Sequence, residues 1–431
     1  MTNRSLLGTA SNSPFSPDFG KTPHSLVGRD SLLAEVGSGL VSGPDDQRYT
    51  SILMGVRGSG KTVALNEIED RAAAEGWVVL SMDAGTPGLL ERIVQSISEA
   101  ERAYDALGLN DSRTKRAVEK SIGIRLGPLV GKIATTEDHE LRSRMGLREH
   151  LTYLVEAAQQ NGSSVLLTVD ELHGIDRTEG RRLSNDLQHI TKRAEMPLAF
   201  LGAGLLELKH TLMRDRKMTF FHRCEHFDMP PLSTADAMVG FAGPVRGADG
   251  AISDDALRLA AGAVDGSPYR LQVIGDIAWK IAGAPDREID SSAVETAVNT
   301  ANSVMNTKIS VPAWHDLSEA DQGLMGAVAL NGGIATSDEV ARGSMLDKRV
   351  VGNALSRLAD LGYVDKPDRG VFRLTGLVPH EVILDEIGHA DDSIASAAVF
   401  PRPKCRKFMP RAKAYCLLPQ DHSGGCRSKH P

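Results

Sequence analysis

The stretch GVRGSGKT, residues 55–62, has the residue types and the spacing of a loop that holds nucleotide phosphates. Its glycines let the backbone turn so that successive N–H groups point at phosphate oxygens. Lys61 would reach the β and γ phosphates, and the hydroxyl of Thr62 would lie on a bound Mg²⁺. The predicted nucleotide contacts run through the whole loop: Gly55, Val56, Arg57, Gly58, Ser59, Gly60, Lys61, Thr62 and Val63.

An acid pair ends the run VLLTVDELHG, residues 165–174. Its mostly apolar, β-branched-rich residues predict a buried parallel strand. Asp170 at the strand tip would hold Mg²⁺ through water, and Glu171 is placed to orient or deprotonate the attacking water. The phosphate loop and the acid pair together predict a site for ATP or GTP with Mg²⁺. The structural alternative is a glycine turn and an unrelated solvated pair of acids.

A phosphate loop needs a strand before it and a helix after it. RYTSILM, residues 48–54, is a short β-rich run, and VALNEIEDRAAAEG has helical spacing of its apolar residues. WVVLSMDAG, residues 77–85, predicts a second core strand followed by a long amphipathic helix. Residues 108–147 contain SIGIRLGPLVGKI, which alternates like a hairpin or a loose insertion. The expected fold class is an α/β P-loop core with a parallel sheet.

SLVGRDSLLAEV, residues 25–36, resembles the (F/L)VGR(E/D) motif of AAA+ and STAND ATPases. The resemblance implies that the backbone of Val27 and Gly28 lies near the adenine and that Arg29 braces the site. It also implies a helical lid after the core, in which Gly266-Ser267-Pro268 corresponds to the family's G-x-P.

Other segments follow the same family order: MPLAFLGAG (196–204) resembles the sensor 1 strand, FFHRCEHFDMPPLS (220–233) the segment that closes the core, and DGSPYRLQVIGDIAWKIAG (265–283) the lid helix. The resemblance covers residues 25–310 and is to the initiator-type, origin-recognition-like branch of AAA+ proteins and to STAND ATPases. It implies ATP hydrolysis with Mg²⁺. Proteins of this kind serve replication, transposition control, transcription and anti-phage defence.

The chain departs from the family at two points. The family has Asn, Ser or Thr at the tip of the sensor 1 strand, where this chain has Gly202-Ala203-Gly204. Arg270, two residues after Pro268, is the one candidate for the sensor 2 arginine. Both departures predict slow hydrolysis, as in a switch. Arg223 stands where the family carries its trans-acting arginine finger, with Arg214 and Arg216 as competitors.

The C-terminal half predicts a DNA-binding module. Helical patterns at 316–333, 336–343 and 345–364 and a hairpin around Asp368-Arg369-Gly370 resemble a winged helix-turn-helix. The third pattern would turn Val350, Val351, Ala354, Leu355, Leu358 and Leu361 inward. Six residues of types that contact phosphates and base edges would face duplex DNA: Lys348, Arg349, Asn353, Arg357, Lys366 and Arg369. The alternative use of such a module is contact with a protein.

The last residues combine positive charge with metal-ligating side chains. Residues 401–431 carry eight Lys or Arg and one acid, whereas the whole chain has a net charge of −7. A basic tail on an acidic body suggests an anionic partner. Its ligands follow the spacing C-x10-C-x5-H-x3-C and resemble short zinc-knuckle tails: Cys405, Cys416, His422 and Cys426. The alternative is a disordered basic tail with free thiols.

Length and composition set the outline. A chain of 431 residues with 41% hydrophobic and 24% charged residues predicts an ordinary protein of several domains. We expect a disordered leader (1–24), an ATPase core (25–232), a helical lid (233–310), the winged helix-turn-helix (311–390) and the basic tail (391–431). No apolar run is long enough to span a membrane, and the first residues lack the apolar core of a signal peptide, which predicts a cytoplasmic protein.

Two functions fit the sequence. One is a switch that couples ATP to homo-oligomerisation and DNA binding. The other is a signalling scaffold that binds ATP and contacts protein through its winged helix. A small-molecule P-loop kinase is disfavoured because no pocket signature for a phosphate acceptor is present.

Overall fold

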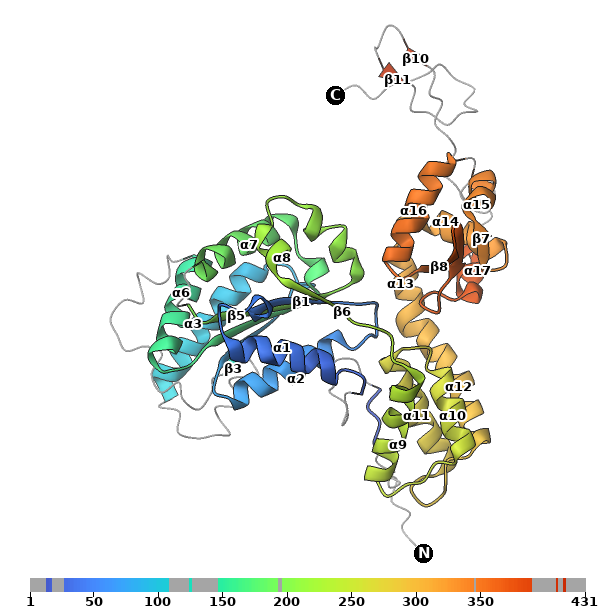
Figure 1. The fold of residues 1–431 in the computed structure, drawn as a ribbon, viewed down its shortest axis with the longest axis horizontal. Helices are drawn as coiled ribbons and strands as arrows, with labels where there is room; N and C mark the ends of the chain where they lie inside the picture. Colours follow the sequence, from blue (N-terminus) through green and yellow to red (C-terminus); the bar gives the residue numbers. More distant parts are fainter. Residues whose placement is uncertain are drawn as a thin grey trace, which may run out of the picture. The chain divides into compact units, whose positions relative to one another are not determined.

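The computed structural model of the protein describes residues 13–17, 27–107, 124–125, 146–192, 196–344 and 346–389, and two short strands at 408–409 and 414–415. The chain divides into two compact units, residues 1–301 and 302–431, which are described separately below (Figure 1).

A six-stranded sheet of order β3-β2-β4-β5-β1-β6 forms the centre of the first unit (Figure 1). Five of its strands run parallel, and the edge strand β3 is antiparallel to β2. The parallel P-loop core predicted from the sequence is therefore confirmed. The strands are β1 (Thr50–Met54), β2 (Val78–Asp83), β3 (Ile124–Arg125), β4 (Val165–Asp170), β5 (Leu198–Gly204) and β6 (Glu225–Asp228).

Helices cover both faces of this sheet, because each central strand is apolar on both sides. Leu53, Val79 and Leu166 pack with α1 and α2, whereas Ile52, Leu80 and Leu167 pack with the helices of the other face. The helices of the first face are α1 (Asp30–Ser42) and α2 (Lys61–Ala74). Those of the second face are α3 (Leu89–Leu107), α6 (Leu147–Gln160), α7 (Arg177–Thr191) and α8 (Thr219–Arg223).

The parallel strands bring the predicted chemistry to one edge of the sheet. Met54 pairs in register with Gly204, and Asp83 pairs with Asp170. The phosphate loop follows Met54 directly. Carboxyl ends of neighbouring parallel strands meet at the same edge, where ligands of open α/β sheets bind.

Four helices follow the core and correspond to the predicted lid: α9 (Thr234–Gly247), α10 (Asp254–Ala263), α11 (Pro268–Ala282) and α12 (Ser291–Met305). Serine side chains cap three of them, since Ser233, Ser253 and Ser267 each accept a hydrogen bond from the backbone N–H three residues on. Pro268 stands at the first position of α11, where its missing N–H costs no hydrogen bond.

The expected disordered leader is wrong for residues 13–17. Phe15 is 4% exposed, and its ring lies 6.0 Å from that of Phe241 in α9. The Ser16 N–H donates to Gln272 of α11 at 2.9 Å. A side chain at Gly275 would overlap the Phe15 ring, because an added Cβ would lie 2.5 Å from it. One buried aromatic ring therefore fixes this segment to the lid, a contact that a polar, low-complexity stretch does not reveal.

The second unit combines helices with a three-stranded sheet of order β7-β9-β8. The helices are α13 (Val311–His315), α14 (Glu319–Leu330), α15 (Ser337–Ser344), α16 (Lys348–Asp360) and α17 (His380–His389). The strands are β7 (Ile334–Thr336), β8 (Val364–Asp368) and β9 (Val371–Leu374). β8 and β9 form the predicted hairpin, in which Gly370 takes a φ of +76° that favours glycine.

The prediction that Val350 of α16 points inward is wrong. Val351, Leu355 and Leu358 are fully buried, as expected, but Val350 is 56% exposed. α16 begins at Lys348, so Val350 falls on the solvent side of its first turn. Helical periodicity could not separate two adjacent valines at a helix start.

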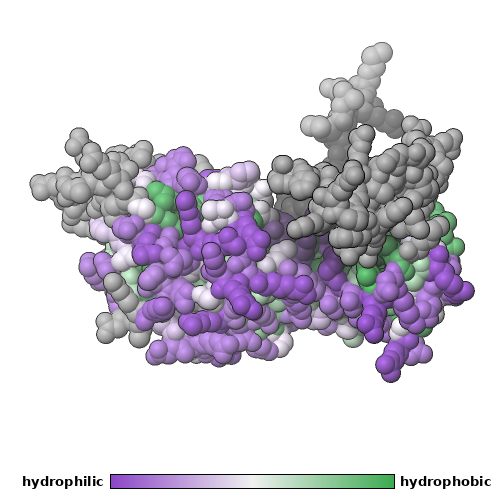
Figure 2. Space-filling model, turned by 90° about the horizontal axis from the view of Figure 1, so that it is seen from above, coloured by the Kyte–Doolittle hydropathy of each residue, from purple (hydrophilic) through white to green (hydrophobic). Residues whose placement is uncertain are grey.

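The described helices were compared with the length and apolarity of membrane-spanning helices. Among the described residues, no helix combines the length and the apolarity that crossing a bilayer requires. On the face drawn in Figure 2, hydrophilic residues predominate and apolar residues form small patches.

Candidate functional site

The phosphate loop has the geometry expected of an anion site. Gly58 and Gly60 take φ values of +74° and +90°, and Gly60 is the N-cap of α2. Gly55 has no room for a side chain, because an added Cβ would lie 2.6 Å from Oγ of Ser59. The loop therefore directs the N-terminus of a 14-residue helix, with its free N–H groups and positive dipole end, at the edge of the sheet.

Lys61 lies buried inside this loop, 6% exposed. Its Nζ donates to the carbonyl oxygens of Gly55 at 3.1 Å and Val56 at 3.0 Å. Burial lowers the pKa of Lys61 to about 8, and the charges of Glu171 and Asp170 partly oppose this shift. The ammonium is thus held next to the position of a bound phosphate, which would restore its ordinary preference for the charged form.

Nucleotide affinity should consequently fall as the pH rises above about 8. Free Lys61 loses its proton above about pH 8, whereas bound phosphate keeps it protonated, so binding takes up a proton in that range. We expect affinity for an ATP analogue to be independent of the Lys61 titration below about pH 8 and to fall about tenfold per pH unit above it. Calorimetry in buffers of different ionisation enthalpy measures both the affinity and the proton uptake. A constant affinity up to about pH 9 would contradict the role of Lys61.

Arg29 connects three segments around the loop and is 2% exposed. Its guanidinium donates to the carbonyl oxygens of Gly28 at 3.1 Å, Ser59 at 3.1 Å and Pro230 at 2.7 Å. Burial lowers its pKa, and Asp236 opposes the shift. The structure therefore gives Arg29 contacts that tie the phosphate loop to the segment after β6.

Val27 and Gly28 lie against the lid helix α9. Gly28 has a φ of +67°, and a side chain there would overlap Leu232 and Asp236. A Cβ at Gly240 of α9 would lie 2.8 Å from the side chain of Val27. The start of the core and α9 are thus packed together at the two residues that the sequence resemblance predicts to lie near the adenine.

The acid pair meets the phosphate loop directly. Thr62 Oγ1 donates to Asp170 Oδ2 at 2.6 Å, although 108 residues separate them. Asp170 Oδ1 accepts from the N–H of Glu171 at 2.8 Å. A hydroxyl and a carboxylate in contact beside a buried lysine are oxygen ligands of the kind that Mg²⁺ prefers with phosphates, so the residues present fit a Mg²⁺–nucleotide complex.

Glu171 follows Asp170 in a left-handed conformation, with a φ of 49°. Non-glycine residues in this region are strained by about 1–3 kcal/mol, and such strain is common at functional sites. Burial and the neighbouring Asp170 raise the pKa of Glu171, while Lys61 and Arg57 oppose the shift. A carboxylate with a raised pKa is a better proton acceptor, as a general base requires.

The tip of β5 explains why no polar residue occupies the sensor 1 position. An added Cβ at Gly202 would lie 2.9 Å from Leu172, and one at Gly204 would lie 2.6 Å from Leu208. These two leucines fill the space that larger residues at the tip would need. No polar side chain therefore extends from residues 202–204 of β5 toward the site.

The lid reaches the phosphate loop through Pro268. An added Cβ at Gly60 would lie 3.9 Å from Cγ of Pro268. Arg270 stands in the first turn of α11, and burial lowers its pKa, partly opposed by Asp265. The structure places Pro268 next to the phosphate loop, and Arg270 lies two residues further along α11.

Arg223 lies at the opposite edge of the sheet from the phosphate loop. It is exposed at the end of α8, two residues before β6 begins. β6 runs parallel to β1, and the phosphate loop follows the end of β1. Arg214 and Arg216 are exposed as well, and Asp215 between them is held by Arg177 and Arg181.

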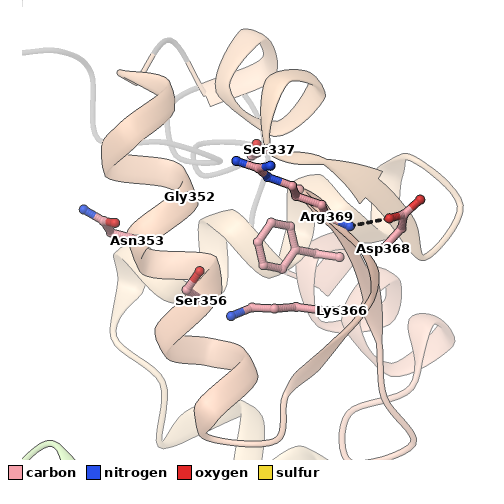
Figure 3. Close-up of a pocket in the computed structure, with 9 residues that line it drawn as sticks. Ser337, Gly352, Asn353, Ser356, Lys366, Asp368 and Arg369 are labelled. Atoms are coloured by element: carbon pink, nitrogen blue, oxygen red, sulfur yellow. Dashed lines mark hydrogen bonds between the residues drawn. The ribbon is translucent and has the colours of Figure 1, made fainter.

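In the second unit, α16 and the β8–β9 hairpin enclose a groove of about 760 Å³ (Figure 3). Ser356 and Lys366 face each other across it, and Lys366 Nζ lies 6.0 Å from the Phe372 ring centre. Arg369 lies at the tip of the hairpin, and Asn353 projects outward from α16 (Figure 3). The groove thus carries polar side chains, with the cation of Lys366 on the side of the β8–β9 hairpin.

Ion pairs divide the predicted DNA-contacting residues into two groups. Lys348 pairs with Asp338 at 2.7 Å, and Arg357 pairs with Asp321, which is 9% exposed in its side chain. Arg349, Lys366 and Arg369 form no ion pair within the part of the chain that the structure describes. We therefore revise the expectation for Arg357, whose main contact is internal.

The predicted zinc ligands Cys405, Cys416, His422 and Cys426 lie outside the described residues, so zinc binding stays a prediction from the sequence. Within the described ranges, no group of three or more His, Cys, Asp or Glu could hold a metal ion.

Two residues near the acid pair were missed in the sequence. Asp83 pairs in register with Asp170, and its charge raises the pKa of Glu171. His173 Nε2 lies 3.1 Å from Glu171 Oε2. Asp83 could have been found as the acid that ends the second core strand, since the ends of parallel strands meet. His173, two residues after Glu171, carries no signal by itself.

Comparisons with known proteins support the fold. No protein-family model and no curated protein sequence matches the chain. The ORC2 protein of Aeropyrum pernix, solved as ADPNP–ADP complexes, superposes with a TM-score of 0.57 at 16% identity, over 88% of this chain and 98% of that one. The Walker-type ATPase of Pyrococcus abyssi superposes with a TM-score of 0.58 at 14% identity, over 83% and 96%. The predicted resemblance to initiator-type AAA+ ATPases is therefore confirmed at the level of the fold.

Proposed function

We propose that the chain is an ATP-binding and slowly ATP-hydrolysing switch of the AAA+/STAND type, which couples its nucleotide state to oligomerisation and DNA binding. The observation that carries the proposal is the 2.6 Å contact between Thr62 and Asp170 beside buried Lys61. It joins the two halves of a nucleotide site, which lie 108 residues apart in the chain. The nucleotide complexes of the A. pernix ORC2 protein, which shares the fold, support the same reading.

Each residue of the site has a task in this proposal. The loop N–H groups and Lys61 bind the phosphates, and Thr62 and Asp170 would hold Mg²⁺, which when bound neutralises charge on the β and γ phosphates. Glu171 orients and deprotonates the attacking water, helped by a raised pKa. Arg29 keeps the loop in place through its three carbonyl contacts.

Slow turnover is supported by the tip of β5. A polar residue at this tip would normally share the positioning of water and γ-phosphate, and Gly202, Ala203 and Gly204 have none to offer. An ATPase without that contact keeps ATP bound for longer, as a switch requires.

Oligomerisation is supported by the place of Arg223. Because Arg223 is exposed at the edge opposite its own phosphate loop, it can serve only the nucleotide of another copy. An arginine supplied in trans would stabilise transition-state charge and make turnover depend on assembly.

DNA binding is supported by the second unit, whose order α14–β7–α15–α16–β8–β9 is that expected of a winged helix-turn-helix. Arg349 and Asn353 are exposed on α16, and Lys366 and Arg369 are exposed on the wing. Side chains of these types bind phosphates, and Asn can also read adenine in the major groove.

Two arginines of α16 provide a matched test of this surface. Arg349→Ala should weaken duplex binding at all sequences and reduce the log–log salt slope by about 1, because it removes one phosphate contact. Arg357→Ala should instead lower the free energy of unfolding by about 1–2 kcal/mol, because the largely buried Asp321 loses its ion-pair partner and, among the described residues, keeps only the hydrogen bond from Ser318. Fluorescence anisotropy and thermal unfolding separate these effects. Equal DNA affinity of Arg349→Ala and the parent across salt concentrations would contradict the proposed face.

The scaffold alternative has one observation in its favour, the exposure of Val350 on α16. An apolar side chain there suits a protein partner, although it also suits the methyl group of thymine. Duplex binding that falls with salt favours DNA, whereas no binding at low salt favours the scaffold.

A further inference from the structure

This chain has Gly202-Ala203-Gly204 at the tip of the strand that carries the polar sensor 1 residue in AAA+ proteins. A histidine, His173, contacts the proposed catalytic carboxylate of Glu171 instead. His173 belongs to the short 3-10 turn Leu172–Gly174, which follows Glu171. Its side chain is 14% exposed. It lies between the acid pair and the end of β5.

His173 contacts Glu171 on one side and Leu205 on the other. Its Nε2 lies 3.1 Å from Oε2 of Glu171. Its Nδ1 accepts a hydrogen bond from the backbone N–H of Leu205 at 3.4 Å, immediately after β5 ends. The imidazole therefore connects the catalytic carboxylate to the strand that carries sensor 1 in related folds.

The two contacts define which nitrogen carries the proton. The N–H of Leu205 can only donate, so Nδ1 must offer its lone pair. Neutral imidazole then has its proton on Nε2, which donates to the Glu171 carboxylate. A single neutral tautomer satisfies both contacts.

We propose that His173 is a positioning residue that fixes the carboxylate of Glu171 from the backbone of β5, in place of a polar side chain at the tip of that strand. The inference rests on the proposed role of Glu171 as general base. Fixing one oxygen leaves the other free to receive the proton of water.

Other charged groups act on the same carboxylate and must be held constant. Asp170 of β4 and Asp83 of β2 raise the pKa of Glu171, while Lys61 and Arg57 of the phosphate loop lower it. None of them is altered in the single variants of His173 chosen below, so a change in kcat can be traced to His173.

Amide side chains separate the two contacts. In His173→Gln the amide nitrogen takes the place of Nε2 and can still donate to Glu171. In His173→Asn the amide reaches only the place of Nδ1, toward Leu205. His173→Ala removes both contacts, and a double variant with Glu171→Gln asks whether His173 acts through Glu171.

The measurements are kcat with saturating ATP and Mg²⁺, and the affinity for ADP. We expect His173→Ala and His173→Asn to lower kcat about tenfold with unchanged ADP affinity. His173→Gln should recover most of the activity, and His173→Ala should have no further effect in the Glu171→Gln background.

Parent-like kcat in both His173→Ala and His173→Asn would overturn the inference, provided that Glu171→Gln is inactive. An equal loss from His173→Ala in both backgrounds would also overturn it, since His173 would then act independently of Glu171. Absence of ATP turnover in the parent protein would refute the proposed function and this inference with it.

Discussion

Replacement of Lys61 by alanine is expected to abolish nucleotide binding, with a loss of affinity of at least about 10²-fold. Lys61 is the buried cation of the phosphate loop, and its ammonium already lies 3.0–3.1 Å from two loop carbonyl oxygens. Alanine leaves the glycine turns and the start of α2 in place but removes the charge that faces the β and γ phosphates. Calorimetric titration with an ATP analogue and Mg²⁺ measures the effect.

Lys192→Ala is the matched control, because Lys192 is exposed at the end of α7, where the chain returns to the start of β5. That edge of the sheet is opposite the phosphate loop. The control should bind nucleotide like the parent, and circular dichroism should show both variants folded. Unchanged affinity in folded Lys61→Ala would refute the phosphate loop.

Replacement of Glu171 by glutamine should keep nucleotide and Mg²⁺ binding but lower kcat about 10²-fold or more. Glutamine has nearly the same shape, so Thr62 and Asp170 keep their contact, but an amide cannot accept the proton of water. Steady-state hydrolysis and ADP affinity, measured on the same preparation, separate chemistry from binding.

Glu67→Gln serves as the control for this second variant. Glu67 pairs with Arg71 on the surface of α2 and lies on the same helix as Lys61. It should leave both turnover and affinity unchanged. If Glu171→Gln turns over ATP like the parent, another residue positions the water, and the roles given to Glu171 and His173 both fail.

The sequence was most informative where function depends on local backbone. The glycines, Lys61 and Thr62 stand next to one another in the chain, and the acid pair ends a strand of continuous apolar residues, so type and spacing were sufficient to predict both. The parallel sheet followed from such strands alternating with helices. Because the strands are parallel, the phosphate loop and the acid pair, which follow or end strands, lie at the same edge of the sheet.

Contacts between distant segments could not be predicted in this way. Phe15 is buried because its ring packs beside Gly275 of α11 and near Phe241 of α9. No pattern in residues 1–24 predicts this contact. The sequence predicts Arg357 as a DNA contact, but in the structure it forms an ion pair with Asp321, which is 36 residues away in the chain. The orientation of His173 likewise depends on a hydrogen bond from the backbone N–H of Leu205, which is 32 residues away in the chain. Each depends on a tertiary partner rather than on its own neighbours.

The most direct test of the whole account is duplex DNA binding as a function of nucleotide state. Fluorescence anisotropy with a short labelled duplex, at several salt concentrations, would compare an ATP analogue, ADP and no nucleotide in the parent and in Lys61→Ala. We expect an affinity that falls with salt, is about tenfold or more higher with the ATP analogue in the parent, and does not respond to nucleotide in Lys61→Ala. A parent protein that binds nucleotide but binds no duplex at low salt, or binds it equally in all three states, would contradict the coupling of ATP to DNA.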